Sequence, residues 1–181
     1  MNEMQAATVL SALSKIERIS TTAGFIAMTL ILFADVVARE ITQSGLLTAR
    51  QYGVYANILV VMFGMGIASA HDAHLRPRFV DTLMSERFKA QTDRLREATT
   101  ALFALVCTWL CAWVTWESYR LEEVSALTGM PIAPFMAIMP CAFLFMAVRH
   151  TLYMIWPKLS PRAEIVNAAE SIEIGHPRST A

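Results

Sequence analysis

The sequence predicts an all-α membrane protein with four transmembrane helices, because four long stretches are almost uncharged and nearly all charges lie between them. A helix needs about 20 mostly apolar residues to cross the hydrocarbon core of a bilayer. The four stretches cover residues 19–38, 52–70, 98–116 and 131–156. They lack the alternating polar face of a membrane β-strand, so we expect helices. Residues 1–156 then form a single membrane domain, and residues 157–181 form a polar cytoplasmic tail.

Each stretch has the composition of a membrane span. The first contains a single charge, Asp35, and the second and third contain none. The fourth is interrupted only by Arg149 and His150 near its end. Pro140 lies near the middle of the fourth stretch, where we expect it to bend the helix.

The distribution of basic residues predicts that both termini face the cytoplasm. The N-terminal segment carries two Lys or Arg residues, the connection between the second and third spans carries six, and the C-terminal side carries four, so 12 of the 15 lie on one side. The other side holds Arg39, Arg50 and Arg120. Aromatic residues at the ends of the predicted spans fit an interfacial belt: Trp116, Tyr119, Tyr153 and Trp156.

Two segments outside the spans are amphipathic, and we expect interfacial helices there. Before the first span, apolar residues recur at helical spacing: Val9, Leu10, Leu13 and Ile16. Between the second and third spans, a second group shares one helical face: Phe79, Val80, Leu83, Met84 and Phe88. The alternative for this second segment is a cytoplasmic extension of the third span.

The composition excludes several functions. Hydrophobic residues make up 55% of the chain, its mean hydropathy is +0.44, and its net charge is zero, so we expect no nucleic-acid partner. The three cysteines all lie inside apolar stretches, where they are poor candidates for a disulfide or a metal site. We expect no cofactor and no metal.

Asp35 is the acidic residue inside a predicted span, which makes it a candidate for proton or cation coupling. Arg39 follows four residues later on the same helical face, so the two side chains can form an ion pair. We favour this structural interpretation, and the coupling role stays open.

The histidines allow a haem or metal hypothesis. His71 and His74 lie at the inner end of the second span and His150 at the inner end of the fourth. Paired histidines on facing helices can ligate haem, but these positions lie at the water boundary, so we favour solvated histidines. No spacing brings Ser, Asp and His residues together, and we expect no catalytic site.

Two features predict contacts between helices. Arg149 lies one to two turns inside the end of the fourth span, where it can extend to the inner interface or reach a carboxylate on another helix. Gly64 and Gly66 belong to the small-residue stretch GMGIASA, which allows another helix to approach closely, within this chain or in another.

Four motifs, taken in order, resemble the small membrane subunit (DctQ type) of tripartite ATP-independent periplasmic (TRAP) transporters. The first span ends in DVVAR (35–39), and the GMGIASA stretch of the second is followed by His74 and a basic amphipathic segment. The third loop ends in LTGMP (127–131), and the fourth span has Pro140 followed by Met146 and Arg149. The resemblance covers residues 16–156.

The resemblance implies a non-catalytic subunit in the bacterial inner membrane. It implies two partners: a large membrane subunit that moves an organic acid in sodium symport, and a periplasmic substrate-binding protein. The small subunit would brace the first and help to dock the second. The outer loops offer charged docking candidates: Arg39, Glu40, Arg50, Arg120, Glu122 and Glu123.

Two other functions remain open. The first is a self-sufficient four-helix homodimeric exporter that uses Asp35. The second is a haem-bearing membrane anchor of a respiratory complex.

Overall fold

The structure is a computed structural model that describes residues 2–46, 48–70 and 86–161. In these residues it contains four long helices, each long and apolar enough to cross a membrane. The helical elements are α1 (Glu3–Thr42), α2 (Ala49–Ala70), α4 (Glu86–Arg120), the short α5 (Ala133–Met136), α6 (Ile138–Ile155) and the 3-10 helix η1 (Pro157–Leu159). The prediction of four membrane helices is therefore confirmed.

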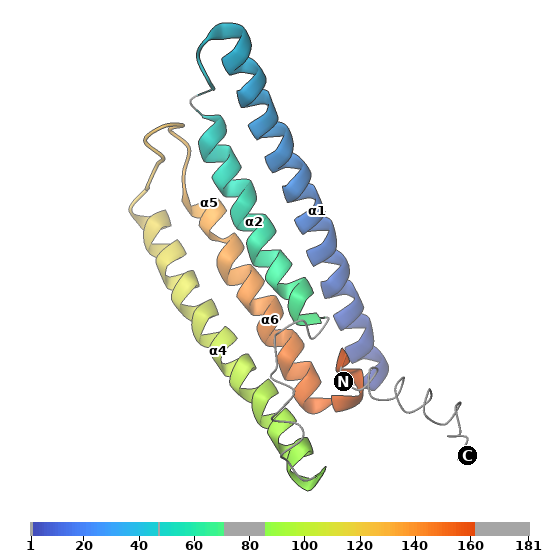
Figure 1. Ribbon diagram of the computed structural model, residues 1–181. Helices are drawn as coiled ribbons and strands as arrows, with labels where there is room; N and C mark the ends of the chain where they lie inside the picture. Colours follow the sequence, from blue (N-terminus) through green and yellow to red (C-terminus); the bar gives the residue numbers. More distant parts are fainter. Residues whose placement is uncertain (1, 47, 71–85, 162–181) are drawn as a thin grey trace, which may run out of the picture.

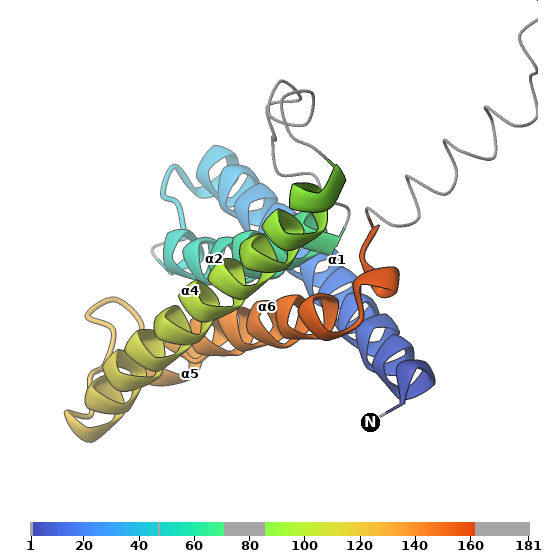
Figure 2. The ribbon, with the colours of Figure 1, turned by 90° about the horizontal axis from the view of Figure 1, so that it is seen from below.

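The four long helices form two pairs, α1 with α2 and α4 with α6, which meet along α2 and α6 (Figure 1). The start of α1 and the end of α6 lie at one end of the bundle, and the connections α1–α2 and α4–α5 lie at the other (Figure 1). Viewed from below, α1 and α4 lean in different directions (Figure 2). The two pairs therefore meet mainly through their inner helices.

Large apolar side chains point outward, and small ones fill the contacts between helices. Phe25, Leu30, Trp109 and Trp113 are 55–69% exposed. The buried apolar residues are mostly alanines: Ala6, Ala49, Ala101, Ala104, Ala133, Ala142 and Ala147. In water this arrangement would leave extensive apolar surface uncovered, whereas lipid chains cover it and small residues let helices pack closely. The packing is that of a membrane bundle.

The segment before the first predicted span is not a separate helix. α1 runs without a break from Glu3 to Thr42, and its 40 residues reach about 60 Å, twice the thickness of the hydrocarbon core. Ala6 and Leu10 pack against Leu152 and Tyr153 of α6. The apolar face predicted to lie on the membrane surface is thus partly used inside the bundle.

The same contact changes the interpretation of two aromatic residues. Tyr153 is buried (7% exposed), and Trp156 packs partly buried against the same cluster, so neither lies fully on the lipid-facing surface. Trp116 and Tyr119 are 61% and 66% exposed, as an interfacial belt requires.

The predicted helix between the second and third spans lies partly outside the described residues, because 71–85 are not described. From Glu86 onward the chain is already α4, which continues without interruption through the third span. Residues 86–97 contain no Gly or Pro that would end a helix. This part of the segment is therefore an extension of the third span.

The fourth span is broken earlier than predicted. α5 ends at Met136 and α6 begins at Ile138, so the break lies near the start of the span and not in its middle. The reason is Pro140, which has no N–H to donate to the carbonyl of Met136, four residues earlier, and whose ring crowds that carbonyl. The bend that a proline causes is located on its N-terminal side.

Candidate functional site

Arg149 is completely buried (0% exposed) although it lies within a membrane span. Its Nη2 donates a hydrogen bond to Glu17 Oε2 of α1, and its Nη1 donates one to the Gly66 carbonyl of α2. Glu17 is also buried (1% exposed). Charges in an apolar medium are costly unless they are paired and hydrogen-bonded. Of the two roles predicted for Arg149, the structure shows the second, a bond to a carboxylate on another helix.

Gly66 allows this contact because it has no side chain. A Cβ at position 66 would lie 2.2 Å from Glu17 Oε1, whereas a Cβ at Gly64 would meet only Thr21 Cγ2, at 4.0 Å. The two glycines of the small-residue stretch therefore face different surroundings. Gly66 faces the interior of the α1–α2 contact, and Gly64 lies at its edge beside Thr21 of α1.

We expect Gly66→Ala to lower the free energy of unfolding by about 1–3 kcal/mol, because the new methyl group displaces the carboxylate that neutralises Arg149. Gly64→Ala is the matched control and should leave stability nearly unchanged. The measurement is the thermal unfolding midpoint of each purified variant in detergent. Equal midpoints for the two variants would contradict the assigned contact.

His150, the next residue of α6, makes a second set of buried contacts on a different side, because successive residues of a helix point about 100° apart. Its Nε2 lies 2.7 Å from Ser69 Oγ of α2, and its Nδ1 lies 2.5 Å from Glu97 Oε2 of α4. Glu97 also accepts a hydrogen bond from Arg96 Nη2 at 2.6 Å. Arg149 and His150 together therefore connect α6 to the other three long helices.

The order Ser69–His150–Glu97 matches the connectivity of a serine-hydrolase triad, which no sequence motif indicated. A catalytic serine must reach its substrate, but Ser69 is 4% exposed and lies in the last turn of α2. A cavity of about 220 Å³ adjoins this group; it is lined by Ser69, Arg96, Glu97, Thr100, His150, Tyr153, Ser160 and Pro161. Because Ser69 and Glu97 each bond to His150, the geometry supports a structural connection between helices.

The haem and metal hypotheses gain no support from the residues that the structure describes. Both ring nitrogens of His150 are engaged, by Ser69 and Glu97. No group of three His, Cys, Asp or Glu residues in the described part of the chain could hold a metal ion. His71 and the candidate His74 lie outside the described residues.

Asp35 has partners for both of its oxygens at the other end of the bundle. Arg39 Nη2 donates to Oδ2 at 2.6 Å, and the Leu46 backbone N–H donates to Oδ1 at 2.6 Å. The carboxylate thus joins the end of α1 to the connection that leads into α2. This geometry supports the structural interpretation of Asp35.

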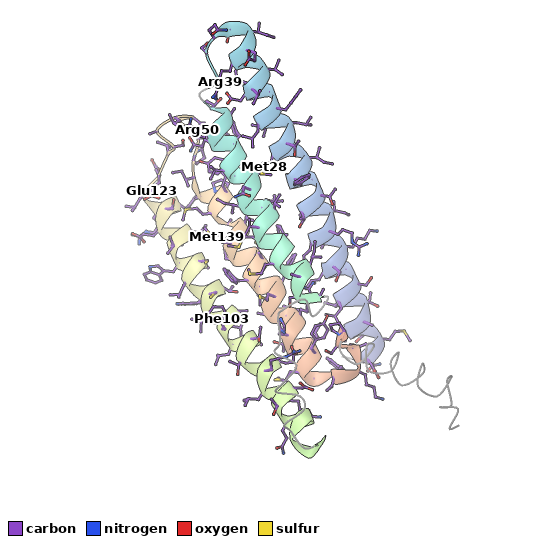
Figure 3. All side chains as sticks on the ribbon, in the orientation of Figure 1. Met28, Arg39, Arg50, Phe103, Glu123 and Met139 are labelled. Carbon is purple, nitrogen blue, oxygen red and sulfur yellow. The ribbon has the colours of Figure 1, made fainter. Side chains whose placement is uncertain are left out.

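The predicted docking residues lie at this same end, where Arg39, Arg50 and Glu123 are labelled (Figure 3). Glu40, Arg50, Glu122 and Glu123 are exposed. Arg120 is exposed as well, with Glu117 at 3.7 Å. These side chains form a mixed-charge surface around the two connections, α1–α2 and α4–α5.

Glu17 and Glu97 were not predicted as functional residues, although a periodic signal was present for each. Ala6, Leu10, Glu17 and Gly24 are buried and recur on one face of α1. Glu97 similarly precedes Ala101 and Ala104 on the buried face of α4. An acidic residue on the packing face of a membrane helix is the pattern that identifies them.

The family comparison identifies the group of proteins to which this bundle belongs. Residues 28–159 match the family model described as the DctQ component of tripartite ATP-independent periplasmic transporters. The chain belongs to the DctQ family. A search of curated proteins found no match. The match to DctQ includes Asp35, Glu97, Arg149 and His150 and begins after Glu17.

A DctQ chain is the small membrane subunit of a TRAP transporter, located in the bacterial inner membrane. The four apolar helices agree with that assignment. The resemblance found in the sequence motifs is confirmed.

Proposed function

We propose that this chain is a non-catalytic brace in a sodium-coupled TRAP transporter for an organic acid. It holds the large membrane subunit in the bilayer and helps to dock the periplasmic substrate-binding protein. The observation that carries the proposal is the pairing of charges within the spans. Asp35, Arg149 and His150 are all bonded to groups of this chain, so they stabilise the bundle. A transport site would instead need polar groups directed at a substrate or ion.

The buried contacts give the bundle the rigidity that a brace needs. Arg149 bonds to α1 and α2, and His150 bonds to α2 and α4. Sliding or rotation of any one helix would leave a charged or polar group without its partner in an apolar medium, which is unfavourable. α1 also extends beyond the hydrocarbon core, because its 40 residues span about 60 Å.

Complementation of uptake tests this proposal. A strain that produces the large subunit and the binding protein but lacks this chain should take up none of a panel of radiolabelled organic acids. Restoring this chain should restore sodium-dependent uptake, and this chain alone should give none. Uptake by this chain alone, lost in Asp35→Asn, would instead support the exporter.

We further propose that both termini face the cytoplasm, which places Arg39, Glu40, Arg50, Arg120, Glu122 and Glu123 on the periplasmic side. The even number of spans and the position of the basic residues support this orientation. The mixed-charge surface then faces the binding protein, where complementary charges accelerate encounter.

The double reversal Glu122→Lys and Glu123→Lys should weaken docking of the binding protein. We expect its apparent Kd to rise by about tenfold at low salt and by less at high salt, because the affected charges are exposed and screened. The measurement is binding of the purified periplasmic protein to the reconstituted membrane complex across a salt series. Glu3→Lys, at the opposite end of α1, is the control, and equal effects of the two changes would exclude a docking role.

A further inference from the structure

One face of α2 is exposed from Arg50 to Val61 and continues into the half-buried Gly64 and Ala68. It consists of Arg50, Val54, Asn57, Val61, Gly64 and Ala68, at alternating spacings of four and three residues, and we name it the α2 stripe. Val54 and Val61 are 52% and 55% exposed, and Arg50 and Asn57 are exposed as well. Other residues of α2, such as Gly53 and Gly66, face α1.

Asn57 is the feature that indicates what covers the stripe. It lies eight residues after the start of α2, about 12 Å along a helix of about 33 Å, and therefore within the hydrocarbon core. No hydrogen bond joins its side chain to any residue in the described part of the chain. The other charged, amide or imidazole side chains in the predicted spans, Asp35, Arg149 and His150, all have partners.

Lipid chains offer no hydrogen-bonding group, so an exposed amide at this depth is costly unless another protein covers it. The exposed faces of α1 and α4 are different. They present apolar side chains such as Phe25, Leu30 and Trp109, which suit lipid. The amide therefore distinguishes the α2 stripe from the other outward surfaces.

The inner half of the stripe also has the shape of a helix-packing surface. A Cβ at Gly64 would have Thr21 Cγ2 of α1 as its nearest neighbour, at 4.0 Å, so Gly64 lies at the edge of the α1–α2 contact. Gly64 and Ala68 are one turn apart and lack bulk, which lets a second helix approach the backbone of α2 closely.

We propose that the α2 stripe is the surface that binds a transmembrane helix of the large membrane subunit. This inference rests on the proposed function, because it takes the large subunit as the partner. The bound helix carries an amide, a hydroxyl or a free backbone carbonyl at the level of Asn57. It carries an acidic or other hydrogen-bond-accepting group near Arg50, which lies at the outer end of α2 (Figure 3).

A second copy of this chain fits the stripe less well. Two copies with the same orientation in the membrane would pair residues at equal height across a two-fold axis. Arg50 would then lie opposite Arg50 of the other copy, which is repulsive. A different partner with an acceptor near Arg50 and a separate hydrogen-bonding group at the level of Asn57 satisfies both residues.

Site-specific photo-cross-linking in membranes that contain the whole transporter tests this assignment. A benzophenone amino acid at Val61 should form an adduct with the large subunit. The same group at Leu30 of α1 or Val106 of α4 should not, and both positions are exposed apolar controls. Cross-links to the large subunit from Leu30 or Val106 but not Val61 would overturn the proposal, as would an adduct of Val61 with a second copy of this chain.

Two variants give an independent measurement in the same complex. Asn57→Leu and Val61→Trp should each reduce co-purification of the large subunit by about tenfold, without lowering the thermal unfolding midpoint of this chain alone, because both positions are exposed. Ala27→Leu on α1 and Ala112→Leu on α4 are exposed small-to-large controls and should not change co-purification. Undiminished co-purification with both α2 variants would overturn the proposal and leave the proposed function intact. Absence of the large subunit from the wild-type purification would overturn both.

Discussion

Arg149→Met is expected to destabilise the four-helix bundle by about 3–5 kcal/mol, because it leaves the buried Glu17 carboxylate without a counter-charge. It also removes the hydrogen bond that the Gly66 carbonyl accepts from Arg149. The thermal unfolding midpoint in detergent should fall by about 10 °C. Intrinsic tryptophan fluorescence reports the transition, since the chain has four tryptophans.

The double variant Glu17→Leu with Arg149→Met is the control for this prediction. Replacing both members of a buried ion pair by apolar residues of similar size is often neutral. We expect most of the lost stability to return, to within about 1–2 kcal/mol of the wild type. Additive losses from the two substitutions would show that Glu17 and Arg149 do not interact.

His150→Leu has the second-largest expected effect, a loss of about 2–3 kcal/mol. The substitution removes the partner of the Ser69 hydroxyl. The buried Glu97 carboxylate loses its bond to His150 and keeps its bond to Arg96. The effect is smaller than that of Arg149→Met because Glu97 keeps this ion pair.

A double-mutant cycle of His150→Leu and Glu97→Gln measures the interaction between these two residues directly. We expect a coupling free energy of about 1–2 kcal/mol, as for a buried charge-assisted hydrogen bond. Ser69→Ala removes one bond and should cost about 1 kcal/mol. A coupling free energy near zero would contradict the hydrogen bond between Glu97 and His150.

Most of the fold could be predicted from the sequence, because membrane spans are defined by local composition. The second and third spans lie within α2 and α4. The segment before the first span was predicted as a separate amphipathic helix, whereas α1 continues through Lys15, Glu17 and Arg18 without a break. The bend in the fourth span was expected at Pro140, whereas the helix breaks between Met136 and Ile138. The reason is that Pro140 has no N–H to donate to the Met136 carbonyl.

The site was less predictable, because its contacts join residues far apart in the chain. Arg149 allowed two roles, and the choice depended on Glu17, which lies 132 residues earlier. Ser69 and Glu97 are ordinary in their local sequence and become significant only when His150 lies between them. Asp35 and Arg39 form an i, i+4 pair, and this contact was predictable from local spacing alone.

The buried contacts and the open α2 stripe have complementary roles in a DctQ subunit. Arg149 and His150 fix the four helices relative to one another, so the bundle presents a constant outer surface. The α2 stripe is the part of that surface with a side-chain amide, Asn57, that no group of the described chain bonds. A rigid subunit with one binding face in the membrane and charged loops at one end is suited to bracing a moving partner.

Affinity purification of the tagged chain from its native membrane in mild detergent tests the central claim most directly. The account predicts that mass spectrometry identifies the large membrane subunit of a TRAP transporter as a stoichiometric partner that survives high salt. The account also predicts that Arg149→Met reduces its recovery. Recovery of this chain alone, or only as a self-associated dimer, would contradict it.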